Sequence, residues 1–324
     1  MCVSPITIRN KGKYGPRSYK VPCGKCVECL KQFQNDWFVR IYEECKNSSS
    51  VLFFTLTYSN EHVPYVVDTD TGELWLSVCV EHLQKAFKRF RVRRDLPNWK
   101  YFICSEYGPK TSRPHYHGLI FGLTKEQFMP FLLDWQNKFG FVNCKVVNFA
   151  VGDYVKVSRY VSKYCSKGVF ENPNVSAGLV RKTFRLCSQH FGESYVDRMR
   201  DFHRGKLGYC GSRRGDYYGF DRDYISFVAH QRNVKIDGIT YKMPDYYKDK
   251  IYGRQTCLSV ALSNFLFEES CELHDRKLSE IQAAYNVSSH EAFGIMAMQE
   301  ASDYSERADR AFSSLSSFYK RSTF

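Results

Sequence analysis

The chain has 324 residues, of which 43% are hydrophobic, enough to bury the core of one large domain or two modest ones. Its 47 Lys and Arg exceed its 34 Asp and Glu, and the net charge of +13 favours a polyanionic partner, because clustered cations release counterions from phosphates. No run reaches the roughly 18 apolar residues of a membrane helix and no export signal is present, so we expect a soluble, intracellular protein with no membrane partner and with reduced cysteines.

The first fifty residues are marked by the run CGKCVEC, which supplies Cys23, Cys26 and Cys29, with Cys2 as a candidate fourth thiol. Thiolates bind zinc, but structural zinc sites usually show two separated pairs of ligands rather than a triplet. The spacing leaves two interpretations open, a structural Zn²⁺ site or reduced structural thiols, and it disfavours an iron–sulfur cluster. Apolar residues at helical spacing then predict a helix that ends near residue 46.

Strand and helix patterns follow one another through the next part of the chain. VLFFTLTY (51–58) predicts a strand, and KYFICSEYG and HYHGLIFG predict two more, joined into a hairpin by a loop that contains Pro. A capping box at Thr124 and Gln127 predicts the start of a helix, which is followed by the strand FVNCKVVNF and a helix over 153–167. This order predicts an α+β fold with a central antiparallel sheet and flanking helices.

The predicted helix over 80–94 carries the densest basic cluster of the chain. Its apolar stripe includes Leu83, Phe87 and Phe90, and the opposite face is basic. That face holds Lys85, Lys88, Arg89, Arg91, Arg93 and Arg94. It is either an ordinary solvated surface or a DNA-binding surface, and we keep it as a candidate for DNA binding.

Composition divides the chain into four segments. Residues 171–254 are basic and rich in Gly, Arg and Tyr, without clear elements. Residues 255–324 hold ten acidic and six basic residues, lack Pro and predict a mainly helical region. The expected organisation is therefore a Cys-rich segment with a leading helix (1–50), a core (51–170), the basic region (171–254) and the acidic helical region (255–324).

His115 and His117 form the first candidate group for chemistry. Alternation along a strand puts both imidazoles on one face of a sheet, where they could share a cation. The hairpin folds Glu106 back toward them, and two imidazoles with a carboxylate would accept Mg²⁺ or Mn²⁺ while leaving coordination positions for substrate oxygens. A structural pair of histidines is the plain alternative.

The run YVSKYCSK forms the second group. On a helix, Tyr160 and Tyr164 lie on one face, and Lys163 and Lys167 each follow their tyrosine by three residues. A phenol is a poor nucleophile at its ordinary pKa, and a nearby lysine that favours the phenolate helps to activate it. Tyrosines attacking a phosphodiester would conserve the bond energy as a phosphotyrosine, whereas the alternative is a helix with a half-buried aromatic face.

The segments FFTLTYSNEHVP, RPHYHGLIFG and YVSKYCSK, in this order, resemble the three motifs of HUH rolling-circle replication initiators. The tandem tyrosines resemble the two-tyrosine subclass, and the whole, with CGKCVECLKQFQNDWFVR, resembles the replication initiators of Microviridae phages, especially gokushoviruses. The resemblance covers roughly residues 20–190.

The resemblance implies that residues 51–170 form an HUH nuclease core. It implies that His115, His117 and Glu106 bind the catalytic metal, that Tyr160 and Tyr164 are nucleophiles, and that the two lysines assist them. The expected function is nicking and rejoining of single-stranded origin DNA in the cytoplasm of an infected bacterium. Because the sequence contains no GxxxxGK[ST] loop, a host helicase and replication machinery are the expected partners.

Two alternatives stay open. One is a plasmid initiator, relaxase or transposase that uses the same tyrosine chemistry. The other is a single-stranded nucleic-acid-binding module without catalysis, since a sheet faced with aromatic and basic residues binds strands by stacking alone. The test that separates the second alternative is whether a covalent DNA–protein adduct forms.

Overall fold

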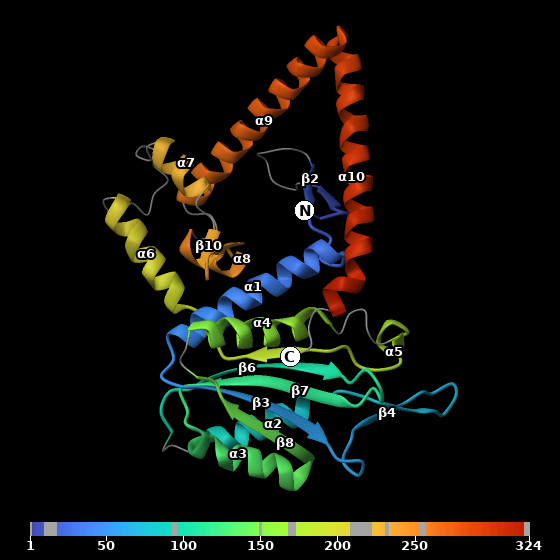
Figure 1. Ribbon diagram of the computed structural model, residues 1–324, viewed down its shortest axis with the longest axis vertical. Coiled ribbons are helices and arrows are strands. Elements are labelled where there is room, and N and C mark those ends of the chain that lie inside the picture. The colour runs from blue at the N-terminus through green and yellow to red at the C-terminus, as the bar shows by residue number, and fades with distance from the viewer. Residues whose placement is uncertain are drawn as a thin grey trace. The chain divides into compact units, whose positions relative to one another are not determined.

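A computed structural model describes residues 2–9, 18–92, 96–148, 151–167, 173–207, 222–230, 233–252 and 257–320. The chain forms two compact units, each assembled from separate segments. The sheet unit combines Phe33–Asp197 with Lys235–Pro244, and the helical unit combines Met1–Gln32, Arg198–Val234 and Asp245–Phe324. The α+β fold expected from the sequence is confirmed, with an antiparallel sheet, flanking helices and a helical C-terminal region (Figure 1).

The sheet unit contains most of the elements predicted from the sequence. They are β3 (Val51–Tyr58), β4 (Tyr65–Val67), β5 (Leu74–Leu76), α2 (Val80–Arg91), β6 (Lys100–Tyr107), β7 (Pro114–Phe121), α3 (Lys125–Lys138), β8 (Gly140–Val146), α4 (Val151–Lys167), α5 (Pro173–Ser176) and β9 (Arg185–Cys187). Three elements cross from one unit to the other along the chain, namely α1 (Val27–Lys46), α6 (Ser194–Leu207) and β10 (Asn233–Ile236), and β11 (Ile239–Lys242) pairs with β10.

Five antiparallel strands form the central sheet in the order β8-β3-β7-β6-β9. The β6–β7 hairpin expected from the sequence lies at its centre, whereas β8 forms one edge and the short β9 the other. Helix α3 begins with the expected capping box, in which the Thr124 hydroxyl accepts from the Gln127 N–H and the Gln127 side chain accepts from the Thr124 N–H.

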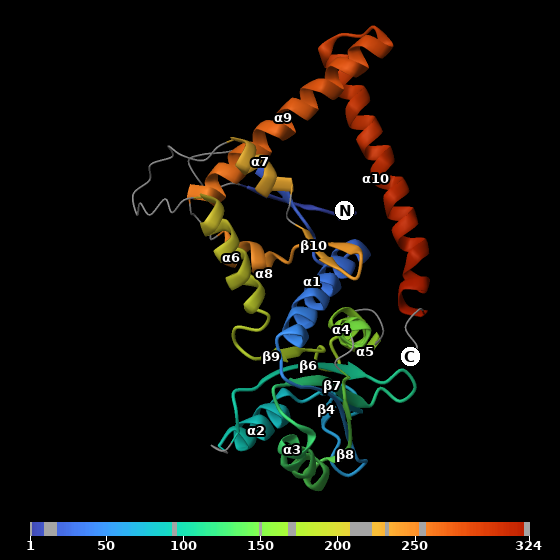
Figure 2. The same ribbon diagram turned by 60° about the vertical axis from the view of Figure 1, so that its left-hand side comes forward.

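Helices α2 and α3 cover one face of the sheet and α4 lies on the other (Figure 2). The face under α2 and α3 holds the main core, in which the rings of Phe54, Phe87 and Phe131 pack together. Gly118 on β7 is part of this packing, because a Cβ built there would lie 2.3 Å from the ring of Phe54. The glycine after the second histidine therefore gives the Phe54 ring its place in the core.

The helical unit holds β1 (Ile6–Arg9), β2 (Ser18–Val21), α7 (Arg222–His230), α8 (Asp245–Ile251), α9 (Cys257–Tyr285) and α10 (Ser289–Lys320). Helices α9 and α10 are joined by a short turn, and a small cluster of Ile281, Ala292 and Met296 packs between them. Ion pairs of Arg222 with Glu268 and of His230 with Glu269 join α7 to α9. Within the described residues, no helix combines the length and apolar character that crossing a bilayer requires.

Candidate active site

Strand register brings the predicted histidines and their partners onto one face of the sheet, the face on which α4 lies. His115 on β7 is paired across the ladders with Thr57 of β3 and Glu106 of β6, and His117 is paired with Thr55 and Cys104. Residues paired in register point to the same side of a sheet, so these side chains form one patch.

His117 is held at the centre of this patch by two hydrogen bonds. Its Nε2 lies 2.9 Å from Glu106 Oε2, and its Nδ1 lies 3.1 Å from the Thr55 hydroxyl. His117 is 9% exposed and Glu106 8%, so the pair is shielded from water. A buried carboxylate beside an imidazole fixes the orientation of the ring, as carboxylates do for metal-bound histidines.

His115 lies further along the strand and has a separate set of contacts. Its Nδ1 is 2.8 Å from the Thr57 hydroxyl, and its ring centroid is 6.4 Å from that of His117. Burial lowers the pKa of His115 and the neighbouring His117 adds to the lowering, so the neutral form is favoured. Gly108 gives this ring room, since a Cβ there would lie 3.0 Å from His115 Nε2.

The two tyrosines of α4 pack directly on this patch. The Tyr164 ring stacks on the His117 ring with a centroid separation of 4.1 Å and an interplanar angle of 11°. The Tyr160 ring meets Tyr164 edge-on at 5.3 Å and meets Phe53 edge-on at 5.5 Å. The tandem tyrosines and the histidines, which are far apart in sequence, therefore form one cluster.

The two phenols differ in their environment. Tyr164 is 8% exposed, whereas Tyr160 is partly exposed. Burial raises the pKa of Tyr164 well above its ordinary value, and its interactions with Tyr160 and with the negative charge of Glu106 raise it further. Tyr164 is consequently protonated and shielded, and Tyr160 is the more accessible of the two.

Of the two predicted lysines, Lys163 has a described side chain. Its Nζ lies 5.7 Å from the centroid of the Tyr160 ring, within the range of a cation–π contact. Lys167 is the last residue of α4, and its side chain lies outside the part of the structure that is described.

The three predicted metal ligands fit a divalent cation by their chemistry. The threonine hydroxyls engage Nδ1 of both histidines, so Nε2 is the nitrogen that each ring offers to a ligand. Glu106 adds a hard oxygen donor. Among the described residues, however, the group whose donor atoms all lie within 4.8 Å of one another consists of cysteines, so joint binding would require the His115 ring to move toward Glu106.

The basic cluster of α2 is not part of this site. The buried face of α2 packs on the opposite face of the sheet from the histidines. Arg89 forms an ion pair of 2.6 Å with Asp134, and Arg91 lies over the rings of Trp99 and Tyr101. Lys85 and Lys88 are exposed on the same helix. Arg93 and Arg94 lie outside the described residues.

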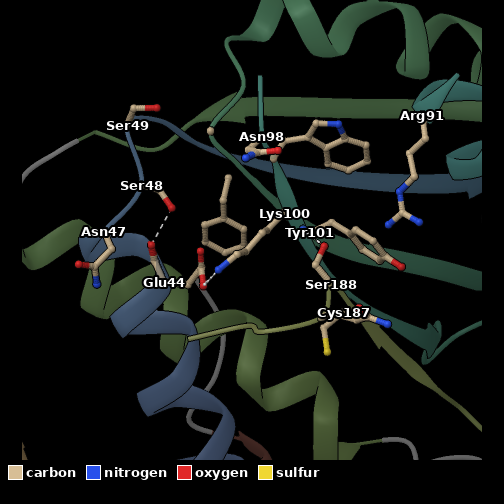
Figure 3. A pocket seen from close by; sticks show the side chains of 14 residues that line it. Glu44, Asn47, Ser48, Ser49, Arg91, Asn98, Lys100, Tyr101, Cys187 and Ser188 are labelled. Carbon is tan, nitrogen blue, oxygen red and sulfur yellow. Dashed lines mark hydrogen bonds and ion pairs between the residues drawn. The ribbon is translucent and has the colours of Figure 1, made fainter. Parts of the chain in front are cut away.

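A cavity of about 990 Å³ opens at the far end of the central strands (Figure 3). It is lined by polar residues that include Lys100, whose Nζ lies 3.0 Å from Glu44 Oε2, and by Arg91. Lys100 begins β6, six residues before Glu106, which corresponds to roughly 20 Å along the strand. The cavity is therefore separate from the histidine and tyrosine cluster.

An exposed strip on the edge strand β8 adjoins the cluster and was not singled out from the sequence. Phe141, Asn143 and Lys145 alternate on the same face as the histidines, because Phe141 is paired with Thr57 and Asn143 with Thr55. Phe141 is 66% exposed, an unusual position for a phenylalanine. Alternation within FVNCKVV was the available signal, but it does not reveal which face of the strand stays uncovered.

Comparisons with known proteins agree with this arrangement. Residues 51–169 match the family model described as replication-associated protein ORF2, a span that contains every histidine and tyrosine of the cluster. The chain is 42% identical over 108 residues to replication-associated protein ORF2 of Spiroplasma virus 4, and 35% identical over 108 residues to replication-associated protein VP4 of Bdellovibrio phage phiMH2K, each match covering 32% of both chains.

A longer and weaker match reaches beyond this span. The chain is 24% identical over 250 residues to replication-associated protein ORF4 of Chlamydia phage 1, covering 72% of this chain and 53% of that protein. The matches thus span about a third to a half of the length of these relatives. No solved structure matches. The resemblance to the replication proteins of Microviridae phages, drawn from the three sequence motifs, is confirmed.

Proposed function

We propose that this chain is a replication initiator that nicks single-stranded origin DNA by tyrosine attack and rejoins the ends, in rolling-circle replication of a circular single-stranded DNA phage genome. The observation that carries the proposal is the stacking of Tyr164 on His117, with Tyr160 beside it and Glu106 bonded to the same imidazole. Similarity to three phage replication-associated proteins supports it.

In the proposed reaction a phenolic oxygen of α4 attacks the phosphorus of a phosphodiester. A bond forms between the tyrosine oxygen and the 5′ phosphate, the bond from phosphorus to the 3′ oxygen breaks, and the phenolic proton is balanced by protonation of the leaving 3′ oxygen. The free 3′ hydroxyl can prime synthesis. The 5′-phosphotyrosine keeps the energy of the broken bond, so a second strand end can be joined later.

Tyr160 is the first nucleophile in this proposal. Its ring is partly exposed, and Lys163 lies beside it, where a cation favours the phenolate and offsets charge on the phosphoryl oxygens. Tyr164 is buried, and burial raises its pKa, which disfavours its phenolate before substrate binds. We assign Tyr164 the second attack, which closes the circle.

His115, His117 and Glu106 would hold the divalent cation, Mg²⁺ or Mn²⁺. Such an ion neutralises charge on the phosphoryl oxygens and orients the phosphate. Thr55 and Thr57 keep the two imidazoles oriented through hydrogen bonds to Nδ1. The low pKa of His115 keeps that ring neutral, which is the form that binds a metal.

The exposed strip on β8 is the proposed path of the single strand. Phe141 lies across the ladder from Thr57, which bonds to His115, so a base stacked on Phe141 would lie about 10 Å from the site, two strand spacings away. Lys145 on the same face can pair with the DNA backbone. In this proposal a host helicase opens the duplex and host replication proteins extend the 3′ end in the bacterial cytoplasm.

Phe141→Ala is expected to weaken binding of single-stranded DNA about 5- to 150-fold, the loss of one stacked base. The matched control is Val146→Ala, because Val146 is 56% exposed on the same strand and points to the other face. Fluorescence anisotropy with a labelled oligonucleotide measures both variants. Equal affinity of Phe141→Ala and Val146→Ala would remove β8 from the DNA path.

The proposed function is tested by incubating the chain with end-labelled single-stranded fragments that together cover the circular genome encoding it. In Mn²⁺ or Mg²⁺, one fragment is expected to form a covalent adduct that survives a denaturing gel. A chelator should abolish the adduct, and added Mn²⁺ should restore it. Mobility shifts on native gels without an adduct under any condition would instead support the non-catalytic binding module.

A further inference from the structure

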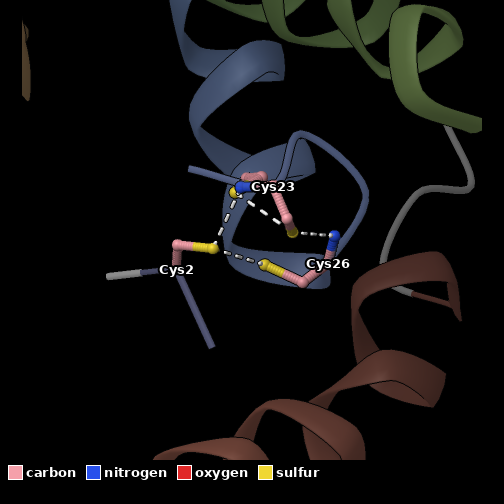
Figure 4. A group of neighbouring side chains, drawn as sticks. Cys2, Cys23 and Cys26 are labelled. Carbon is pink, nitrogen blue, oxygen red and sulfur yellow. Dashed lines mark hydrogen bonds between the residues drawn. The ribbon is translucent and has the colours of Figure 1, made fainter. Parts of the chain in front are cut away.

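Four thiols from separate parts of the N-terminal segment converge in the helical unit (Figure 4). Cys23 and Cys26 come from the turn before α1, Cys29 from its first turn, and Cys2 from the start of the chain. All four sulfur atoms lie within 4.8 Å of one another. The sequence offered Cys2 only as a candidate, because a residue 21 positions upstream has no spacing signal, and the fold brings it to the other three.

The spacing of the sulfurs is that of ligands around one ion. Cys23 Sγ lies 3.9 Å from Cys29 Sγ, and Cys26 Sγ lies 3.8 Å from Cys2 Sγ. Zn–S bonds of about 2.3 Å in a tetrahedron put sulfur atoms about 3.8 Å apart. A disulfide would need about 2.05 Å, and all four cysteines are free. We propose that Cys2, Cys23, Cys26 and Cys29 bind one structural Zn²⁺.

Backbone amides support the sulfur positions. The N–H of Cys23 donates to Cys2 Sγ at 3.2 Å, and the N–H of Cys26 donates to Cys23 Sγ at 3.3 Å. The turn between Cys23 and Cys26 uses Gly24 at φ +73°, a conformation that side-chain-bearing residues rarely adopt. Amide donors of this kind orient thiolates and offset part of their negative charge, which four sulfurs around one divalent ion require.

The surrounding structure has little apolar material that could do the same work. The residues of β1 are all exposed, including Ile6 at 52% and Ile8 at 41%. The Tyr304 hydroxyl of α10 donates to the carbonyl oxygen of Cys2 at 3.0 Å, which ties the same segment to the helical unit. A metal that joins Cys2 to the start of α1 would stabilise this segment where a hydrophobic core does not.

The proposed ion is distinct in chemistry from the catalytic one. Four soft thiolates with no open coordination position select zinc and leave no place for substrate, whereas imidazoles and a carboxylate suit Mg²⁺ or Mn²⁺. The four sulfurs also lie too close together to enclose a multinuclear iron–sulfur cluster. The zinc site therefore does not depend on the proposed nicking reaction.

The test is metal analysis of the full chain, purified under reducing conditions without chelator. Mass spectrometry of the metal content is expected to find one zinc per chain, and Cys23→Ser and Cys29→Ser are each expected to lose at least about nine-tenths of it. Cys271→Ser is the matched control, because Cys271 is a free, exposed cysteine on α9 of the same unit, and it should keep the full equivalent.

A spectroscopic measurement on the unmutated chain decides the matter if the serine variants do not fold. Chain stripped of zinc and titrated with Co²⁺ is expected to show the thiolate charge-transfer and ligand-field bands of a tetrahedral tetrathiolate site, which one equivalent of Zn²⁺ abolishes. Folded chain without metal, an iron content in place of zinc, disulfides among the four cysteines, or zinc retained in both serine variants would each overturn the proposal. None of these outcomes affects the adduct assay, in which Mn²⁺ alone restores activity.

Discussion

Tyr160→Phe is expected to slow the covalent attachment of DNA by at least about 10³-fold, because it removes the oxygen that we propose attacks first. Tyr164→Phe is expected to keep the first cleavage within about tenfold of the wild-type rate and to block the second attack, so that cut DNA accumulates without rejoining. The two substitutions remove the same atom from rings 5.3 Å apart, and the contrast between them isolates the order of attack.

The physical basis for this contrast is the difference in burial. Tyr164 lies flat on His117 at 4.1 Å, and burial raises its pKa, so its phenolate is disfavoured until other groups of the site change. Tyr160 is partly exposed and has Lys163 over its ring. A strand that enters along β8 therefore reaches Tyr160 before Tyr164.

Mass spectrometry of the peptide that carries the DNA measures which tyrosine was used, and a denaturing gel gives the rate. Tyr154→Phe is the matched control, since it removes a buried phenol from the same helix and should cleave at the wild-type rate. Finding the first adduct on Tyr164 would reverse the proposed order, and finding it on neither tyrosine would remove α4 from the chemistry.

Local signals in the sequence explain why much of the sheet unit could be predicted. The β6–β7 hairpin follows from two uninterrupted apolar and aromatic runs joined by a loop with Pro, and the start of α3 follows from Thr124 and Gln127. The helix predicted over 80–94 corresponds to α2, which ends at Arg91. These features depend on residues close together in sequence, so periodicity and capping chemistry suffice.

Other features depend on contacts between distant residues. Strand β9 has three residues and pairs with β6, which lies far upstream in the chain, and so short a strand has no pattern of its own. The amphipathic pattern of α2 predicts that Phe87 is buried, but it does not state which face of the sheet the helix covers. The candidate DNA-binding cluster and the histidines are therefore on opposite faces, which charge and spacing alone could not reveal.

The candidate site shows the same division. Strand alternation was sufficient to put His115 and His117 on one face of the sheet, and helical spacing was sufficient to put Tyr160 and Tyr164 on one face of a helix. Stacking of Tyr164 on His117 depends on how α4 crosses the sheet, and the exposure of Phe141 depends on β8 being an edge strand. Both are properties of packing between elements rather than of any one segment.

His117→Ala is expected to lower nicking by at least about 10³-fold, which corresponds to about 4 kcal/mol of transition-state stabilisation. The imidazole contacts three groups that the reaction would need, namely Glu106 through Nε2, Thr55 through Nδ1 and Tyr164 by stacking. Alanine removes a proposed ligand and the surface on which the second nucleophile rests. It also leaves the buried Glu106 carboxylate without its partner.

Because that loss of packing could lower activity without any role in metal binding, the measurement must separate the two. Binding of Mn²⁺, followed by electron paramagnetic resonance, is expected to weaken in His117→Ala and in Glu106→Gln, while His62→Ala, a loop histidine bonded to Ser59, binds as the wild type does. His117→Gln keeps an amide that can bond to Glu106 and is a poor metal ligand, so it should restore thermal stability but not Mn²⁺ affinity or nicking. Wild-type Mn²⁺ affinity in a folded His117→Ala chain would mean that the imidazole orients Tyr164 without binding metal, and the proposed set of ligands would then be wrong.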